Sequence, residues 1–201
     1  MKSAHDPLNL IVCGVGGQGN ILISRMIGRI LTQNGYWVTI GETFGAAQRG
    51  GPVFSSLRIS KRKYYGPLIP EGKAHVILSL EPMETLRTLH VYGNPQVITL
   101  TNFHPLYPVG VLSQRLVYPD LEAIKGAIQR LSKTSSFVRA TEIAIELGAP
   151  IASNIVMLGA LAGTEQVPFS AKDVEEEIRT TFPASKVELN LKALRLGVSA
   201  L

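Results

Sequence analysis

The sequence has few residues of the kinds that bind metals or form disulfides: among its 201 residues are one cysteine, Cys13, and four histidines. A single cysteine cannot close a disulfide within the chain, and it cannot supply the thiolates of a usual zinc or iron–sulfur site. The histidines, at positions 5, 75, 90 and 104, show no spacing typical of metal ligands. We therefore expect this chain alone to bind no metal, and the scarcity of cysteine fits a reducing compartment such as the cytoplasm.

Motifs of several common enzyme classes are also absent. No tyrosine is followed by a lysine four residues later, which is the catalytic pair of the short-chain dehydrogenases. There is no G-x-x-x-x-G-K-[ST] loop of the P-loop nucleotidases and no G-x-S-x-G turn of the serine hydrolases. The chain therefore carries no recognisable catalytic group of these classes.

Membrane and nucleic-acid signals are weak. No apolar run reaches the roughly 18 residues that span a bilayer, and the first nine residues lack the apolar core of a signal peptide. The formal net charge is +5, with the densest cluster at residues 61–63. Such a short cluster is typical of a solvated turn, and no long basic stripe or nucleic-acid-binding motif is present. We expect no membrane and no nucleic-acid partner; the positive charge suits an anionic ligand or an acidic protein.

Hydrophobic patterning predicts strands that alternate with helices along the chain. The predicted strands cover residues 8–13, 36–42, 53–60, 74–80, 96–101 and 111–118, and the predicted helices residues 19–34, 82–90, 120–131, 137–147, 151–162, 170–181 and 185–196. Gly197 is expected to end a helix, and Ser185 with Glu188 to form a capping box. The pattern predicts one domain over residues 1–201, a Rossmann-like three-layer α/β fold whose mostly parallel sheet carries helices on both faces.

Residues 8–24, LNLIVCGVGGQGNILIS, join a predicted buried strand to a helix through a glycine-rich loop. Gly14, Gly16 and Gly19 have the spacing G-x-G-x-x-G, which offers backbone N–H groups and the positive end of a helix dipole to an anion. The spacing matches the fingerprint of NAD(P)-binding dehydrogenases, with Glu42 in the place of the acid that binds the ribose. A dinucleotide- or nucleotide-binding module is one interpretation. The other is that these glycines only permit a tight turn and close packing.

A second glycine-rich loop, FGAAQRGGP at residues 44–52, follows the next predicted strand. It contains Gln48, Arg49, Gly50 and Gly51. Arginine holds a carboxylate or a phosphate through two parallel hydrogen bonds, and the glycines let a ligand or another subunit approach the backbone. Loops that follow strands of a parallel sheet gather at its carboxyl edge, so we expect Arg49 near the first glycine loop.

The pair GVGGQGN and GETFGAAQRGGPV strongly resembles the gamma-type module of 2-oxoacid:ferredoxin oxidoreductases, most of all the small subunit of the indolepyruvate-specific enzymes. Further matches are YPD at 118–120, SNIVMLGAL at 153–161 and NLKALRLG at 190–197, so the resemblance covers essentially the whole chain. It implies a subunit of a complex that decarboxylates a 2-oxoacid, such as indolepyruvate or another arylpyruvate, and forms acyl-CoA, CO₂ and reduced ferredoxin.

The resemblance also implies cofactors that this chain is not expected to hold. Thiamine diphosphate, Mg²⁺ and [4Fe-4S] clusters are implied on a larger partner subunit, with CoA as co-substrate and ferredoxin as the electron acceptor of the complex. The chain alone is then expected to be inactive. No residue is assigned a catalytic role, and the expected contacts to a ligand or to the partner come from Gly14, Gly16, Gly17, Gln18, Gly19, Gln48, Arg49, Gly50 and Gly51.

The predicted helix near residue 154 carries small residues that leave a smooth face: Ala152, Gly159, Ala160, Ala162 and Gly163. Such a face can pack closely against a partner subunit. It can also belong to an ordinary helix buried within the chain, which is the more common case.

Overall fold

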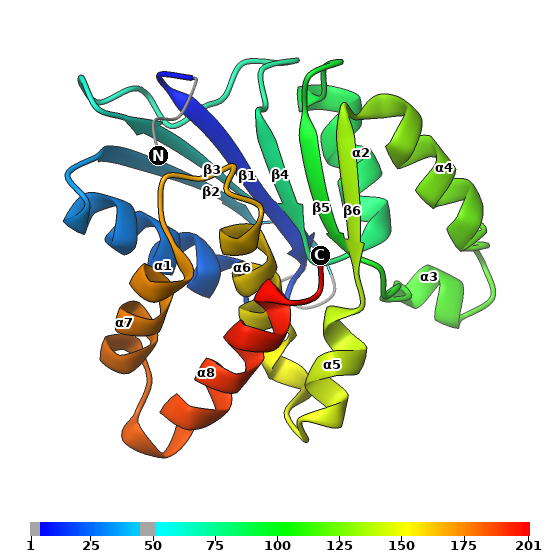
Figure 1. The fold of residues 1–201 in the computed structure, drawn as a ribbon. Coiled ribbons are helices and arrows are strands. Elements are labelled where there is room, and N and C mark those ends of the chain that lie inside the picture. Colours follow the sequence, from blue (N-terminus) through cyan, green and yellow to red (C-terminus); the bar gives the residue numbers. More distant parts are fainter. Residues whose placement is uncertain (1–4, 45–50) are drawn as a thin grey trace.

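The computed structural model describes residues 5–44 and 51–201, and within them the strands form one six-stranded sheet of order β2-β3-β1-β4-β5-β6 (Figure 1). The strands are β1 (Leu8–Val15), β2 (Trp37–Phe44), β3 (Pro52–Ser60), β4 (Val76–Ser79), β5 (Ile98–Asn102) and β6 (Thr134–Val138). β1, β4, β5 and β6 are parallel, and β3 runs antiparallel to both β1 and β2. The register places Val15 opposite Pro52, so β3 begins where β1 ends.

Helices cover both faces of the sheet, which becomes the middle of three layers (Figure 1). They are α1 (Asn20–Gln33), α2 (Pro82–Tyr92), α3 (Val109–Leu112), α4 (Leu121–Leu131), α5 (Ala140–Glu146), the 3-10 turn η1 (Pro150–Ala152), α6 (Ser153–Gly163), α7 (Ala171–Thr181) and α8 (Ala184–Val198). α1, α6, α7 and α8 pack on the face that carries Leu10 and Val12 of β1. α2 and α4 pack on the face that carries Ile11 and Cys13. No helix in the described ranges is long and apolar enough to cross a bilayer.

The predicted three-layer α/β fold with a mostly parallel sheet is confirmed, but one predicted strand is wrong and one observed strand was not predicted. Residues 111–118 are not a strand, because α3 ends at Leu112 and turns and extended chain follow. The sequence pattern predicts a helix that begins at residue 137 and no strand before it, whereas the structure has the strand β6 at Thr134–Val138. Its sequence, TSSFV, is polar, and it lies at the sheet edge, paired with β5. A polar edge strand lacks the continuous apolar run that identifies buried strands.

Two predicted helix signals are also wrong. Gly197 does not end a helix but lies inside α8. The start of α8 has no side-chain capping bond, so Ser185 and Glu188 form no capping box. The capping box that the structure shows joins Ser170 and Asp173 at the start of α7. Its Asp in place of Glu at the third helical position makes this motif harder to recognise in a sequence.

The small residues of α6 pack within the chain, against α8. A Cβ atom added to Gly159 would lie 2.3 Å from the carbonyl oxygen of Leu194, and one added to Gly197 would lie 2.0 Å from that of Val156. Each glycine therefore lets the backbone of the other helix approach more closely than a side chain would permit. Of the two interpretations of this small-residue face, the structure supports a helix buried in the core of the chain itself.

Candidate functional site

The carboxyl ends of β1 and β4 form the candidate site. α1 follows β1 and packs on one face of the sheet, whereas α2 follows β4 and packs on the other. The chain thus leaves two adjacent parallel strands in opposite directions, which opens a crevice at the carboxyl edge. Open α/β sheets bind their ligands at such a switch point. The first glycine loop, residues 14–19, lies there between β1 and α1.

The conformation of this loop requires two of its glycines. Gly17 has φ +100° and Gly19 has φ +87°, which L side chains rarely adopt. A Cβ atom on Gly19 would also lie 2.1 Å from the side-chain nitrogen of Asn154, near the start of α6. Packing therefore accounts for part of the glycine spacing, while Gly17 itself is exposed at the crevice.

Gln18 holds the first loop to the sheet. Its Oε1 accepts a hydrogen bond from the N–H of Val15 (2.7 Å), and its Nε2 donates to the carbonyl of Leu80 (2.8 Å), which follows β4. The same carbonyl accepts a bond from Nδ2 of Asn102 at the end of β5 (3.2 Å). Gly14 leaves room for the Gln18 side chain, because a Cβ atom there would lie 2.8 Å from its Oε1. Gln18 thus joins the loop to β4, and its predicted contact with a ligand stays a prediction.

The second glycine loop meets the first at Gly51. The N–H of Gly16 donates to the carbonyl of Gly51 (2.8 Å). At the other end of the connection, Phe44 pairs with Val53 in the register of β2 and β3. The described residues that flank 45–50, Phe44 and Gly51, thus lie at the carboxyl edge. Three predicted site residues lie outside the described residues: Gln48, Arg49 and Gly50.

Glu42 is not next to the first loop, which contradicts its predicted role in a dinucleotide site. β3 lies between β1 and β2, whereas a Rossmann dinucleotide site needs the second strand directly beside the first. The Glu42 carboxylate pairs with Arg25 of α1 at 3.4 Å. Glu42 is therefore not placed to bind the ribose of a nicotinamide dinucleotide, and the dehydrogenase interpretation lacks the acidic residue predicted for this role.

A cavity of about 310 Å³ opens beside the two loops. Its walls come from the end of β1, the start of β3, the start of α2 and the segment between β5 and α4. Most lining residues are apolar or aromatic: Val15, Pro52, Met83, Leu106, Tyr107, Pro108, Val111, Leu116, Val117, Tyr118 and Pro119. Charged residues complete the lining: Glu81, Glu84 and Arg87. The cavity suits an apolar group whose edge can reach a polar wall.

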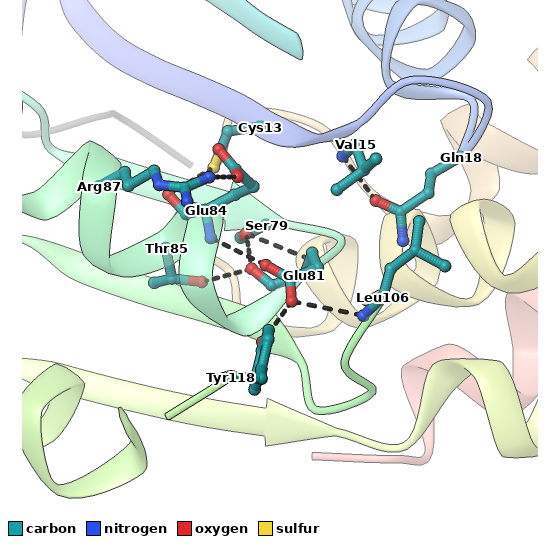
Figure 2. A network of polar contacts seen from close by, with 10 residues as sticks. All are labelled: Cys13, Val15, Gln18, Ser79, Glu81, Glu84, Thr85, Arg87, Leu106 and Tyr118. Atoms are coloured by element: carbon teal, nitrogen blue, oxygen red, sulfur yellow. Dashed lines mark hydrogen bonds and ion pairs between the residues drawn. The ribbon is translucent and has the colours of Figure 1, made fainter. Parts of the chain in front are cut away.

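Glu81 is the buried polar centre of this region (Figure 2). It is 1% exposed, and its Oε2 caps α2 by accepting the N–H of Glu84 (3.0 Å). Its Oε1 accepts hydrogen bonds from the hydroxyl of Tyr118 and from the N–H of Leu106 (3.4 Å). Burial and the bond to Glu81 raise the pKa of Tyr118 far above its usual value, so the hydroxyl stays protonated and donates. One carboxylate thus joins α2 to both ends of residues 106–118.

Sequence reasoning missed Glu81 and the contact with Tyr118. Glu81 follows a buried strand and precedes Pro82, the favoured first residue of a helix, so its capping position could have been recognised. Tyr118 lies in the YPD stretch that contributes to the resemblance. Their contact joins residues 37 positions apart, which no local pattern indicates.

Glu84 and Cys13 lie at the back of the same region (Figure 2). Burial raises the pKa of Glu84, although its ion pair with Arg87 opposes the shift. The Cys13 thiol lies 3.7 Å from the carbonyl oxygen of Glu84, and burial raises its pKa to about 12. The thiol is therefore protonated and unreactive at neutral pH. Among the residues that the structure describes, no group of three or more His, Cys, Asp or Glu side chains could hold a metal ion.

Replacing Tyr118 with phenylalanine should loosen this region without unfolding the protein. The substitution keeps the ring but removes a donor from the buried Glu81 carboxylate, which costs about 1–2 kcal/mol. The melting temperature should fall by about 2–8 °C. Tyr107→Phe is the matched control, because its exposed ring packs edge-on against Tyr118 while no bond joins its hydroxyl to Glu81. Equal melting temperatures for the two variants would contradict this role of Tyr118.

The chain is similar to known oxidoreductase subunits in sequence. The family described as pyruvate ferredoxin/flavodoxin oxidoreductase matches residues 9–200. The indolepyruvate oxidoreductase subunit IorB of Pyrococcus horikoshii is 40% identical over 194 residues, which cover 96% of this chain and 95% of that protein.

Solved structures show the same fold in two settings. The pyruvate oxidoreductase subunit PORC of Thermotoga maritima matches with a TM-score of 0.71 at 22% identity, covering 98% of this chain and 97% of that one. The 2-oxoglutarate:ferredoxin oxidoreductase of Magnetococcus marinus matches with a TM-score of 0.76 at 21% identity. There the match covers 98% of this chain but 31% of the other chain. The fold is thus a whole subunit in one protein and one part of a longer chain in the other.

Proposed function

The chain belongs to the pyruvate ferredoxin/flavodoxin oxidoreductase family, and from this we propose that it is the small subunit of a thiamine-dependent 2-oxoacid:ferredoxin oxidoreductase. Indolepyruvate or another arylpyruvate is the proposed substrate. The observation that carries this choice is the 40% identity, over nearly the whole of both chains, to an indolepyruvate oxidoreductase subunit. In the proposed reaction the complex decarboxylates the 2-oxoacid, transfers the acyl group to the thiol of CoA and passes two electrons to ferredoxin.

The resident cofactors of this reaction do not fit the residues of this chain. Cys13 is its one cysteine and is buried and protonated, so the chain cannot ligate a [4Fe-4S] cluster by itself. The sequence also contains no G-D-G motif for thiamine diphosphate and its Mg²⁺. We propose that a larger partner subunit holds these groups, that the complex works in the cytoplasm, and that this chain shapes the active site or the path of CoA.

The two glycine loops are the proposed point of contact with an anion or with the partner. The hydrogen bond between Gly16 and Gly51 supports this proposal, because it brings the loops together at the start of α1. Arg49 lies two positions before Gly51 in the sequence, outside the residues that the structure describes. We propose that its guanidinium binds a phosphate of CoA or the carboxylate of the 2-oxoacid, because it can hold either group through two parallel hydrogen bonds.

Reconstitution of the complex tests this proposal. The isolated chain should be colourless and should not reduce a viologen dye with indolepyruvate and CoA, because it holds neither thiamine diphosphate nor an iron–sulfur cluster. Addition of the purified larger subunit should produce turnover. The larger subunit alone is the control. Turnover by this chain alone would contradict the proposal, and so would a rate that does not change when the chain is added to the larger subunit.

A further inference from the structure

Residues 106–117, here called the apolar segment, expose an unusual amount of apolar surface. The segment crosses from β5 to α4 and includes α3. Its exposed side chains, with their exposed fractions, are Leu106 (41%), Tyr107 (47%), Leu112 (68%), Leu116 (63%) and Val117 (92%). Single exposed apolar residues are common on protein surfaces, but a cluster of this kind typically marks a binding surface.

The apolar segment is anchored at both ends. The N–H of Leu106 and the hydroxyl of Tyr118 both donate to the buried Glu81 carboxylate (Figure 2). The rings of Tyr107 and Tyr118 also pack edge to face, with centroids 5.1 Å apart. The exposed side chains therefore belong to a segment whose two ends are held at the start of α2, and binding through them loses less conformational entropy than binding through a loop without such bonds.

A hollow lies beneath the apolar segment. Leu106, Leu116 and Val117 line the 310 Å³ cavity together with Val15 and Pro52. A surface with protruding apolar side chains beside an apolar hollow has the form of a protein interface, in which buried anchor residues supply most of the affinity. Because Val15 and Pro52 adjoin the two glycine loops, the hollow is continuous with the candidate site.

We propose that the apolar segment and the hollow beneath it dock the larger catalytic subunit, which inserts an apolar or aromatic side chain. This inference rests on the proposed function. It is supported by the Magnetococcus marinus structure, in which the same fold is 31% of a longer chain and so is covalently joined to other parts of an oxidoreductase. Under the proposed function the larger subunit is a separate chain, so the corresponding contact forms between chains, and the apolar segment adjoins the glycine loops that we propose as a point of contact.

Binding of purified subunits tests the docking surface. Leu116→Asp and Val117→Asp place an unpaired charge in the interface, so each should weaken binding of the larger subunit at least tenfold in calorimetry or interferometry. Leu68→Asp is the matched control, because Leu68 is also an exposed apolar residue (77%) but lies away from the apolar segment. Its carbonyl accepts a hydrogen bond from Arg58, which also donates to Asn9 at the start of β1, whereas the hollow lies at the end of β1. It should bind within twofold of the unchanged chain. Melting temperatures must show that all three variants are folded.

Three results would overturn the inference, and they have different meanings. If the complex forms and all three variants bind equally well, the partner docks elsewhere while the proposed function stands. If the isolated chain is a dimer that Val117→Asp separates, the surface binds a second copy. If the unchanged chain does not bind the larger subunit at all, both the inference and the proposed function are wrong.

Discussion

Replacing Gly197 with alanine is expected to lower the free energy of unfolding by about 3 kcal/mol, although alanine is the better helix former. The added Cβ atom would lie 2.0 Å from the carbonyl oxygen of Val156 and 3.0 Å from the backbone nitrogen of Ala160. These are backbone atoms of α6, so no side-chain rotation relieves the clash, and α6 and α8 must move apart. For a protein of this size the melting temperature should fall by about 6–12 °C.

Gly126→Ala is the matched control for this prediction. Gly126 also lies inside a helix, α4, but the nearest atom to its added Cβ is Nη1 of Arg130 at 3.3 Å, the end of a flexible side chain. Here the gain in helix propensity of about 1 kcal/mol should remain, and the melting temperature should stay level or rise. If Gly197→Ala is as stable as Gly126→Ala, the close contact of α6 and α8 is not as described.

Replacing Arg49 with lysine should reduce kcat/KM of the reconstituted complex by about 10–100-fold. Lysine keeps the positive charge but cannot form the two parallel hydrogen bonds of a guanidinium with a phosphate or carboxylate. Losing such a charge-assisted contact costs about 1.5–3 kcal/mol, which corresponds to this range of rates. The two KM values should show which ligand Arg49 contacts. If the contact is with CoA, the KM for CoA rises; if it is with the 2-oxoacid, the KM for indolepyruvate rises.

Arg62→Lys is the matched control for Arg49→Lys, because it makes the same substitution at an arginine far from the proposed site. Arg62 is 81% exposed and pairs with Asp6 at 3.4 Å, away from the carboxyl edge, so Arg62→Lys should leave the kinetics unchanged. Arg49→Lys should also keep the melting temperature of the isolated chain. An unchanged kcat/KM would remove Arg49 from the proposed site, and a much lower melting temperature would make it a structural residue.

Local patterns in the sequence were sufficient to predict the buried strands and the first glycine loop. β1 reads as a strand because it is apolar on both faces, and the turn after it needs glycine at Gly17 and Gly19 because their φ angles are positive. A two-residue period identifies β3 as a strand but carries no information on its direction. The antiparallel course of β3, and with it the displacement of Glu42 from the first loop, therefore had to come from the structure.

The missed features depend on contacts between distant segments. Gly197 follows a helical pattern and so resembles a cap, whereas its role is set by the backbone of α6. The Glu81 carboxylate receives bonds from Leu106 and Tyr118, and the cavity walls come from segments that a sequence pattern treats separately. β6 is recognisable through its pairing with β5 rather than through its own polar residues.

The antiparallel course of β3 places the connection between β2 and β3, which belongs to the proposed site, outside the paired residues of the sheet. β2 and β3 are paired from Trp37–Ser60 to Phe44–Val53, and β1 and β3 are paired from Leu8–Ile59 to Val15–Pro52. Gly51, which directly precedes β3, accepts a hydrogen bond from the N–H of Gly16 in the first glycine loop. Under the proposed function, substitutions in the connection between β2 and β3 alter the groups offered to a ligand, while the residues that pair in the sheet stay unchanged. In evolutionary terms, the proposed site would let members of one family diverge in substrate through the connection between β2 and β3, with the rest of the domain inherited intact.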